Sequence, residues 1–125
     1  MNLIFVFVGG GIGSVARYIT TTFIKNVTAV SFPFGTLAVN IIGSFFMGLI
    51  TALIAEKFFS NAEPFRLALA VGFLGGFTTF SSFSMETLTL VERHEILYAL
   101  TNVAANVTFG LLAAYFGFTL MKNIL

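Results

Sequence analysis

The stretch FRLALAVGFLGGFTTFSSFS, residues 65–84, decides the fold because it joins an apolar segment to a polar one without an intervening loop. Its first half is almost wholly apolar, whereas its second half alternates hydroxyl side chains with phenylalanines after the pair Gly75–Gly76. Two successive glycines are poor helix formers, each costing roughly 1 kcal/mol against alanine. The stretch therefore predicts a membrane-spanning helix that is broken near its middle, at the glycine pair.

The composition of the 125-residue chain is that of a membrane protein. It is 58% hydrophobic and 9% charged, whereas soluble domains carry about 25% charged residues. The chain has no cysteine and one histidine, His94, which argues against disulfides and against a metal cluster built on these residues. A net charge of +1 without a basic run argues against a nucleic-acid partner. We find no nucleophile–base pair and expect no enzyme activity.

Four apolar segments are long enough to cross a bilayer as helices, which takes about 20 residues. They cover about residues 3–24, 33–55, 65–91 and 96–121, and short connections join them. They are too long and too continuously apolar to be the strands of a β-barrel, which alternate over about 10 residues. We therefore expect residues 1–125 to form one all-α transmembrane domain of four helices.

The charged residues at the ends of these segments favour neither orientation in the membrane. Lys57, Arg66 and Lys122 lie on one side, Lys25 and Arg93 lie on the other, and Arg17 lies nearer to the second group. Orientation follows the excess of lysine and arginine on the cytoplasmic side, so this balance is compatible with insertion both ways. The sequence has no internal repeat, so an inverted-repeat architecture would require two copies paired head to tail.

Each segment carries one row of polar residues at helical spacing. The rows are Ser14, Arg17 and Thr21; Thr36, Asn40 and Ser44; Thr78, Ser82 and Glu86, with Ser81 beside them; and Tyr98, Asn102 and Asn106. Hydrogen bonding between helices is one interpretation. Asparagines and a carboxylate at membrane depth also typically face a bundle interior or an aqueous pathway. We favour the pathway interpretation.

Arginine and phenylalanine side chains in the polar rows allow two interpretations each. Arg17 lies about 10 Å inside the end of its helix, where it could extend to the interface or attract anions into a vestibule. Phe77, Phe80 and Phe83 recur every three residues, as in a core or a lipid contact. Because they alternate with hydroxyls, their electropositive ring edges could instead coordinate an anion.

Glycine pairs also allow two interpretations. Gly9–Gly13 and Gly72–Gly76 have the GxxxG spacing by which membrane helices approach closely. The pair Gly75–Gly76 could instead unwind the helix, and unwound backbone at membrane depth needs protein, water or an ion to satisfy it. Freed carbonyls in broken transporter helices hold cations in this way.

Three motifs together resemble the Fluc/CrcB family of bacterial fluoride channels. They are GGGIGSVARY at 9–18, which has one glycine more than the family pattern, GTLAVN at 35–40 and GFLGGFTTFSSFSME at 72–86. The third is long and unusual, and the resemblance covers essentially the whole chain. It departs from the family at Ser82, where threonine is usual; both residues carry a hydroxyl.

The resemblance implies a multi-pass protein of the bacterial inner membrane that exports fluoride passively. It implies an antiparallel, dual-topology homodimer with two separate pores. It also implies a structural Na⁺ at the dimer centre, held by the backbone carbonyls of Gly75 and Thr78 of both subunits.

The resemblance further implies which side chains meet the ion. Phe80 and Phe83 would line the pore and offer ring edges to fluoride, with Asn40 beside them. Arg17 would stand in the vestibule. The polar track for the ion would consist of Thr36, Ser81, Ser82 and Glu86. Asn106 is added from its spacing alone, since its position varies in the family, and the role of Asn102 stays open.

Two other functions compete with a fluoride channel. A small dual-topology, proton-coupled multidrug exporter would need a carboxylate deep in its first span, where this chain has none, so Glu86 is the candidate coupling acid. A structural assembly subunit without transport would leave the alternation of phenylalanine and hydroxyl residues unexplained.

Overall fold

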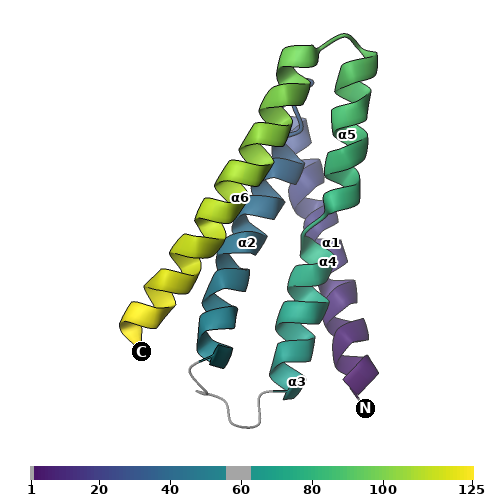
Figure 1. The fold of residues 1–125 in the computed structure, drawn as a ribbon. Helices are drawn as coiled ribbons and strands as arrows, with labels where there is room; N and C mark the ends of the chain where they lie inside the picture. The colour runs from purple at the N-terminus through teal and green to yellow at the C-terminus, as the bar shows by residue number, and fades with distance from the viewer. Residues whose placement is uncertain (1, 56–62) are drawn as a thin grey trace.

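A computed structural model describes residues 2–55 and 63–125, where the regular secondary structure is helical. Within these ranges, four helical segments are long and apolar enough to cross a membrane. Three of them are single helices: α1 (Asn2–Thr28), α2 (Phe34–Ala55) and α6 (Ile96–Ile124). Helix α2 packs against both α1 and α6, whose described residues do not contact each other. Figure 1 shows the N- and C-termini at the same end of the molecule. Lys57 lies outside the described residues.

The remaining segment, Glu63–Glu92, consists of four successive pieces. These are α3 (Glu63–Phe65), η1 (Arg66–Leu74), α4 (Gly75–Phe77) and α5 (Phe80–Glu92). The η1 piece has the wider turns of a π-helix, a rare conformation that often marks functional sites. Figure 1 shows α5 continuing in nearly the same direction as α4, so the segment bends only slightly.

Helical geometry is lost at Thr78 and Thr79, three residues after the position at which we expected the break to begin. Thr78 has φ −82° and ψ 159°, and Thr79 has φ −152° and ψ 119°, both extended. Gly75 is helical, with φ −62° and ψ −37°. Gly76 serves close packing instead, since a β-carbon there would lie 2.5 Å from the Gly10 carbonyl oxygen of α1. The prediction of a break at the glycine pair was therefore misplaced within the right segment.

Close approach of glycines explains how the helices pair. A β-carbon on Gly9 would overlap the Ala68 carbonyl oxygen, and one on Gly13 would overlap that of Phe73, so α1 packs backbone to backbone on η1. The GxxxG interpretation is confirmed at this contact. A second pairing of the same kind, between α2 and α6, rests on Gly48 and Gly117.

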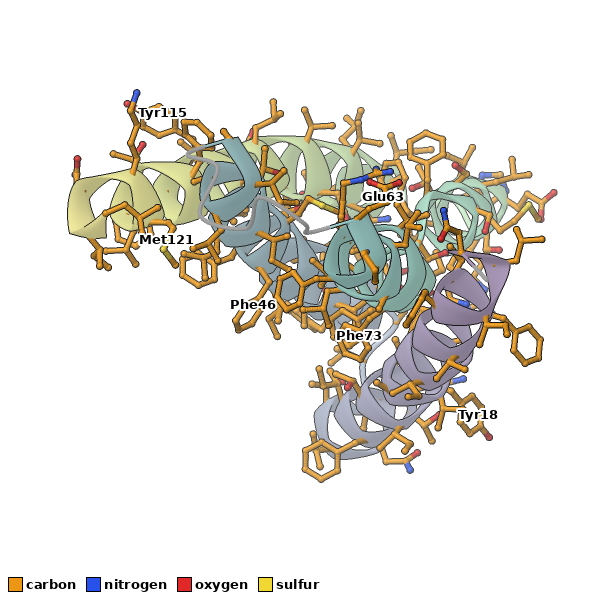
Figure 2. The ribbon with its side chains drawn as sticks, turned by 90° about the horizontal axis from the view of Figure 1, so that it is seen from below. Tyr18, Phe46, Glu63, Phe73, Tyr115 and Met121 are labelled. Atoms are coloured by element: carbon orange, nitrogen blue, oxygen red, sulfur yellow. The ribbon has the colours of Figure 1, made fainter. Side chains whose placement is uncertain are left out.

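The helices form an open L rather than a closed bundle. Viewed along the helices in Figure 2, α6 and α2 make one arm, α1 makes the other, and the interrupted segment lies at the corner. Phe46 and Phe73 point toward the inner angle of the L. A single copy thus leaves aromatic side chains facing an uncovered inner angle.

Candidate functional site

The interruption between α4 and α5 is held by one side chain from α2. The Asn40 Oδ1 atom accepts the Thr79 N–H at 2.9 Å, and Asn40 Nδ2 donates to the Thr79 carbonyl at 3.1 Å. In a continuous helix the Thr79 N–H would donate to the Gly75 carbonyl, four residues earlier. Asn40 therefore replaces a helical hydrogen bond, which is what allows the chain to unwind here at low cost.

Thr79 also begins the next helix, since threonine is a favoured N-cap residue. Its side-chain oxygen accepts the Ser82 N–H at 3.2 Å, and its hydroxyl donates to the Ser82 Oγ atom at 3.0 Å. The Ser81 hydroxyl oxygen lies 3.4 Å from the Thr79 Oγ1 atom. Because the Ser82 oxygen is an acceptor in this arrangement, its own O–H remains able to donate to another group. The first turn of α5 is thus a cluster of hydroxyls gathered around a buried threonine.

A hollow of about 340 Å³ opens beside the interruption. Asn40, Phe80, Phe83 and Asn106 line it, together with Thr78 and Thr79. The ring centroids of Phe80 and Phe83 are 5.4 Å apart and the rings are tilted by 53°. Phe83 is 8% exposed, whereas Phe80 is 79% exposed, so one ring belongs to the core of this copy and the other projects from it. We call this space the aromatic hollow.

A second hollow, of about 530 Å³, lies between the C-terminal ends of α1 and α5 and the start of α2. Thr36 and Glu86 line it, and the cationic residues Lys25 and Arg93 also contribute to its wall. The Thr36 hydroxyl donates to Glu86 Oε1 at 2.7 Å. Among the described residues, Glu86 Oε2 is buried and has no hydrogen-bond partner. We call this space the polar hollow.

The two hollows follow one another along the same helices. Thr36 and Asn40 are four residues apart on α2, a rise of about 6 Å. Glu86 and Phe83 are three residues apart on α5, a rise of about 4.5 Å. The aromatic hollow and the polar hollow therefore lie at successive levels of the molecule, and polar groups line both.

Arg17 reaches the interruption from the opposite side, on α1. Its Nη1 atom donates to the Thr78 carbonyl oxygen at 3.1 Å. This cation lies at the C-terminal end of the helical run that ends at Phe77, where a positive charge interacts favourably with the helix dipole. Arg17 thus helps to hold the unwound backbone, a role different from simple extension to the interface.

A hydrogen-bonded chain of three asparagines runs from the aromatic hollow into the contact between α6 and α5. Asn40 Nδ2 donates to Asn106 Oδ1 at 2.9 Å, and Asn106 Nδ2 donates to Asn102 Oδ1 at 2.9 Å. Asn102 is completely buried and donates to the Thr87 hydroxyl oxygen of α5 at 2.9 Å. Polar groups buried this deeply are normally hydrogen-bonded, and here they bond to one another.

The residues expected to form the site fall into three groups. Asn40, Phe80, Phe83 and Asn106 meet at the aromatic hollow, with Ser81 and Ser82 gathered beside Thr79. Thr36 and Glu86 meet at the polar hollow. Arg17 meets the Thr78 carbonyl at the interruption, and Gly75 lies three residues earlier, at the start of α4.

Sequence reasoning missed two residues and left one without a role. Thr79 organises the interruption, and the preference for threonine at the N-cap of a helix is a signal that could have found it. Lys25 of the polar hollow looked like an ordinary charge at a helix end, and no local pattern distinguishes it. Asn102 stood in the fourth polar row, and its burial depends on contacts with α5 that the row does not specify.

The fold and the site define a multi-pass membrane protein in which polar and aromatic side chains line successive hollows beside an interrupted helix. The chain belongs to the CrcB-like family, because the model of that family, described as CrcB-like protein, Camphor Resistance (CrcB), matches residues 4–118. This membership bears out the resemblance stated from the motifs.

Known relatives of the chain match it over nearly its full length. It is 50% identical over 117 residues to the fluoride-specific ion channel FluC of Shewanella loihica, covering 93% of this chain and 92% of that protein. It is 45% identical over 124 residues to the protein of the same name from Chelativorans sp., covering 99% and 98%. It is 44% identical over 119 residues to that from Alteromonas mediterranea, covering 95% and 93%.

Proposed function

We propose that the chain is a fluoride channel of the bacterial inner membrane that lets fluoride leave the cell passively, down its electrochemical gradient. Membership of a family whose relatives are named fluoride-specific ion channels supports this function. The observation that carries it is the aromatic hollow, where two phenylalanine rings, hydroxyl side chains and two amides surround space beside unwound backbone. A channel performs no covalent chemistry, so no catalytic residue is required.

Fluoride is small and strongly hydrated, so it enters a narrow pore only if other donors replace its water. Ser81 and Ser82, which gather beside Thr79 in the wall of the aromatic hollow, would supply O–H groups, and the rings of Phe80 and Phe83 would supply electropositive edges. These donors are neutral, so they bind the anion firmly enough to remove its water and weakly enough to release it. Passage then requires a further site of similar strength along the route.

The polar hollow supplies the next part of the route. Thr36 and Glu86 follow the aromatic hollow by about one helical turn. Lys25 and Arg93 in its wall raise the local concentration of anions by their positive charge. In this scheme Arg17 acts from the opposite side of the interruption, both as an attractant for anions and as a support for the Thr78 carbonyl.

The working unit in this proposal is an antiparallel homodimer with two separate pores, made by copies that insert in opposite orientations. The open L supports it, because a second copy would cover the aromatic face in the inner angle. The even distribution of Lys and Arg between the two sides supports dual topology. Crosslinking of single-cysteine variants labelled from opposite sides of the membrane tests this arrangement.

A structural Na⁺ at the dimer centre is the remaining part of the proposal. The Gly75 carbonyl has lost its ordinary donor, because the Thr79 N–H bonds to Asn40 instead. The Thr78 carbonyl accepts one hydrogen bond from Arg17 and retains a second lone pair. Carbonyl oxygens freed from a helix are suitable ligands for Na⁺, so these residues fit the ion. We expect Na⁺, but not K⁺, to raise the melting temperature of the purified protein.

Reconstitution into liposomes tests the function directly. Vesicles loaded with fluoride should release it on addition of a K⁺ ionophore, as measured by a fluoride electrode, whereas chloride-loaded vesicles should not release chloride. Folded, dimeric protein that releases no fluoride would contradict the proposal. The multidrug-exporter alternative is not favoured, because the relatives are named ion channels; it predicts resistance to lipophilic cations that Glu86→Gln abolishes.

A further inference from the structure

The chain of asparagines has a direction that backbone groups fix at both ends. Asn40 faces a backbone N–H and a backbone carbonyl of Thr79, so only one orientation of its amide satisfies both. Asn106 Nδ2 lies 3.0 Å from the backbone carbonyl of Asn102, which only a donor can satisfy. The oxygen of Asn106 must therefore point toward Asn40.

Asn102 secures this orientation from within the protein. Its side-chain oxygen accepts from Asn106 Nδ2 at 2.9 Å, and its nitrogen donates to the Thr87 oxygen at 2.9 Å. The Thr87 hydroxyl donates its own proton to the Phe83 carbonyl at 2.8 Å, so its oxygen is free to accept. Each group in the chain thus has one consistent assignment, from the core of the protein to the wall of the aromatic hollow.

Both N–H groups of Asn40 are occupied as a result. One donates to the Thr79 carbonyl and the other to Asn106 Oδ1. The first bond belongs to the pair that holds the interruption, whereas the second reaches an amide oxygen in the wall of the aromatic hollow. The Asn106 Oδ1 atom carries a partial negative charge and accepts the Asn40 N–H. An anion in the aromatic hollow would otherwise accept the same N–H.

We propose that Asn106 Oδ1 occupies the Asn40 N–H when no anion is present, and that fluoride displaces it on entering the aromatic hollow. Asn106 is then a residue that sets the affinity of the site, and Asn102 is a positioning residue that keeps its oxygen aimed at Asn40. This inference rests on the proposed function and adds to it a group within the protein, Asn106 Oδ1, that competes with fluoride for the Asn40 N–H. Exchanging one acceptor for another keeps fluoride binding weak, as conduction requires.

Substitutions at Asn106 should change fluoride affinity in opposite directions. Asn106→Leu has similar size and removes the competing oxygen, so the dissociation constant should fall roughly three- to tenfold, as for loss of one competing hydrogen bond. Asn106→Asp offers a stronger acceptor and should raise it by at least as much. Asn102→Leu removes one of the two acceptors that orient the Asn106 amide and keeps the other, the Asn102 backbone carbonyl, so it should give a smaller decrease than Asn106→Leu. Thr101→Val, on the exposed neighbouring position of α6, is the matched control and should change nothing.

The measurement is a fluoride titration of the full-length ¹⁵N-labelled protein in detergent, following the side-chain amide resonances of Asn40 by NMR. We expect fluoride, but not chloride, to shift them in the wild-type protein. If Asn106→Leu leaves the Asn102 oxygen unpaired and fails to fold, the double variant Asn102→Leu/Asn106→Leu removes both amides and should show the same gain in affinity.

Two results separate this inference from the function on which it rests. Wild-type protein that releases fluoride from liposomes while its Asn40 resonances stay unmoved would overturn the inference alone. Unchanged or weaker fluoride binding by folded Asn106→Leu and by the double variant would do the same, since it would make Asn106 only a structural support. Wild-type protein with neither flux nor binding would overturn the proposed function together with the inference.

Discussion

Asn40 and Thr79 form a closed pair of hydrogen bonds between a side-chain amide and a backbone unit. The amide oxygen accepts at 2.9 Å and the amide nitrogen donates at 3.1 Å, much as two residues exchange both bonds across antiparallel strands. This pair joins α2 to the one point where the third span is not helical. The interruption is therefore held by a specific tertiary contact, and does not result only from poor helix formers in the local sequence.

Replacing Asn40 should destabilise the protein more than replacing a neighbour in the same hollow. Asn40→Leu keeps the size of the side chain but leaves the Thr79 N–H and carbonyl unpaired, at a cost of about 1–3 kcal/mol for each buried group. Ser44→Ala, one turn further along α2 in the wall of the same hollow, is the control. Chemical unfolding in detergent micelles measures both. Equal stability of the two variants would mean that water or another group satisfies the interruption.

The contrast between Asn40 and the glycine pair explains what the sequence could and could not predict. The four spans follow from apolar segment length, which local composition determines. The interruption also follows from the sequence, but its position does not, because a side chain 39 positions away takes the Thr79 N–H. Gly76 allowed two interpretations, as a helix breaker and as a packing residue, and the structure supports packing, since α1 lies against it.

The candidate site was predicted in its parts and not in its connections. Helical spacing put Thr36 and Asn40 on one face of α2, and both line hollows. Spacing cannot specify that Asn40 bonds to Asn106, because this contact depends on how α2 and α6 pack through their glycines. The resemblance to a known family implied roles for most site residues. It implied no role for Asn102, whose burial and hydrogen bonds depend on the packing of α6.

The two phenylalanines of the aromatic hollow should respond differently to the same substitution. Phe80→Ile removes an exposed ring, so folding should change little while fluoride flux falls about tenfold, corresponding to about 1.4 kcal/mol of lost ring-edge interaction. Phe83→Ile removes a buried ring and should lower stability by about 1–3 kcal/mol as well. Flux per folded protein and the melting temperature distinguish the two effects. Undiminished flux in Phe80→Ile would argue against coordination of fluoride by that ring.

Lys25 should affect the rate of fluoride flux through long-range electrostatics alone. Its positive charge lies in the wall of the polar hollow, where it attracts anions from solution. Lys25→Gln removes this charge and should slow flux several-fold at low ionic strength. The difference should disappear near 1 M salt, where charges are screened within about 3 Å. Lys122→Gln in the last turn of α6, away from both hollows, is the control. A defect that persists at high salt would mean that Lys25 binds the ion directly.

Alanine substitutions at two glycines of α1 should have opposite effects on stability, because one glycine faces η1 and the other faces away. A β-carbon on Gly9 would overlap the Ala68 carbonyl oxygen, and backbone cannot move aside as a flexible side chain can, so Gly9→Ala should cost about 1–3 kcal/mol or more. A β-carbon on Gly11 meets nothing within 4 Å, so Gly11→Ala should leave stability unchanged or raise it by up to about 1 kcal/mol through better helix propensity. Thermal unfolding in one detergent compares the two. A cost for Gly11→Ala as large as for Gly9→Ala would show that its face is also covered in the assembled protein, and would locate part of the contact between copies on that side of α1.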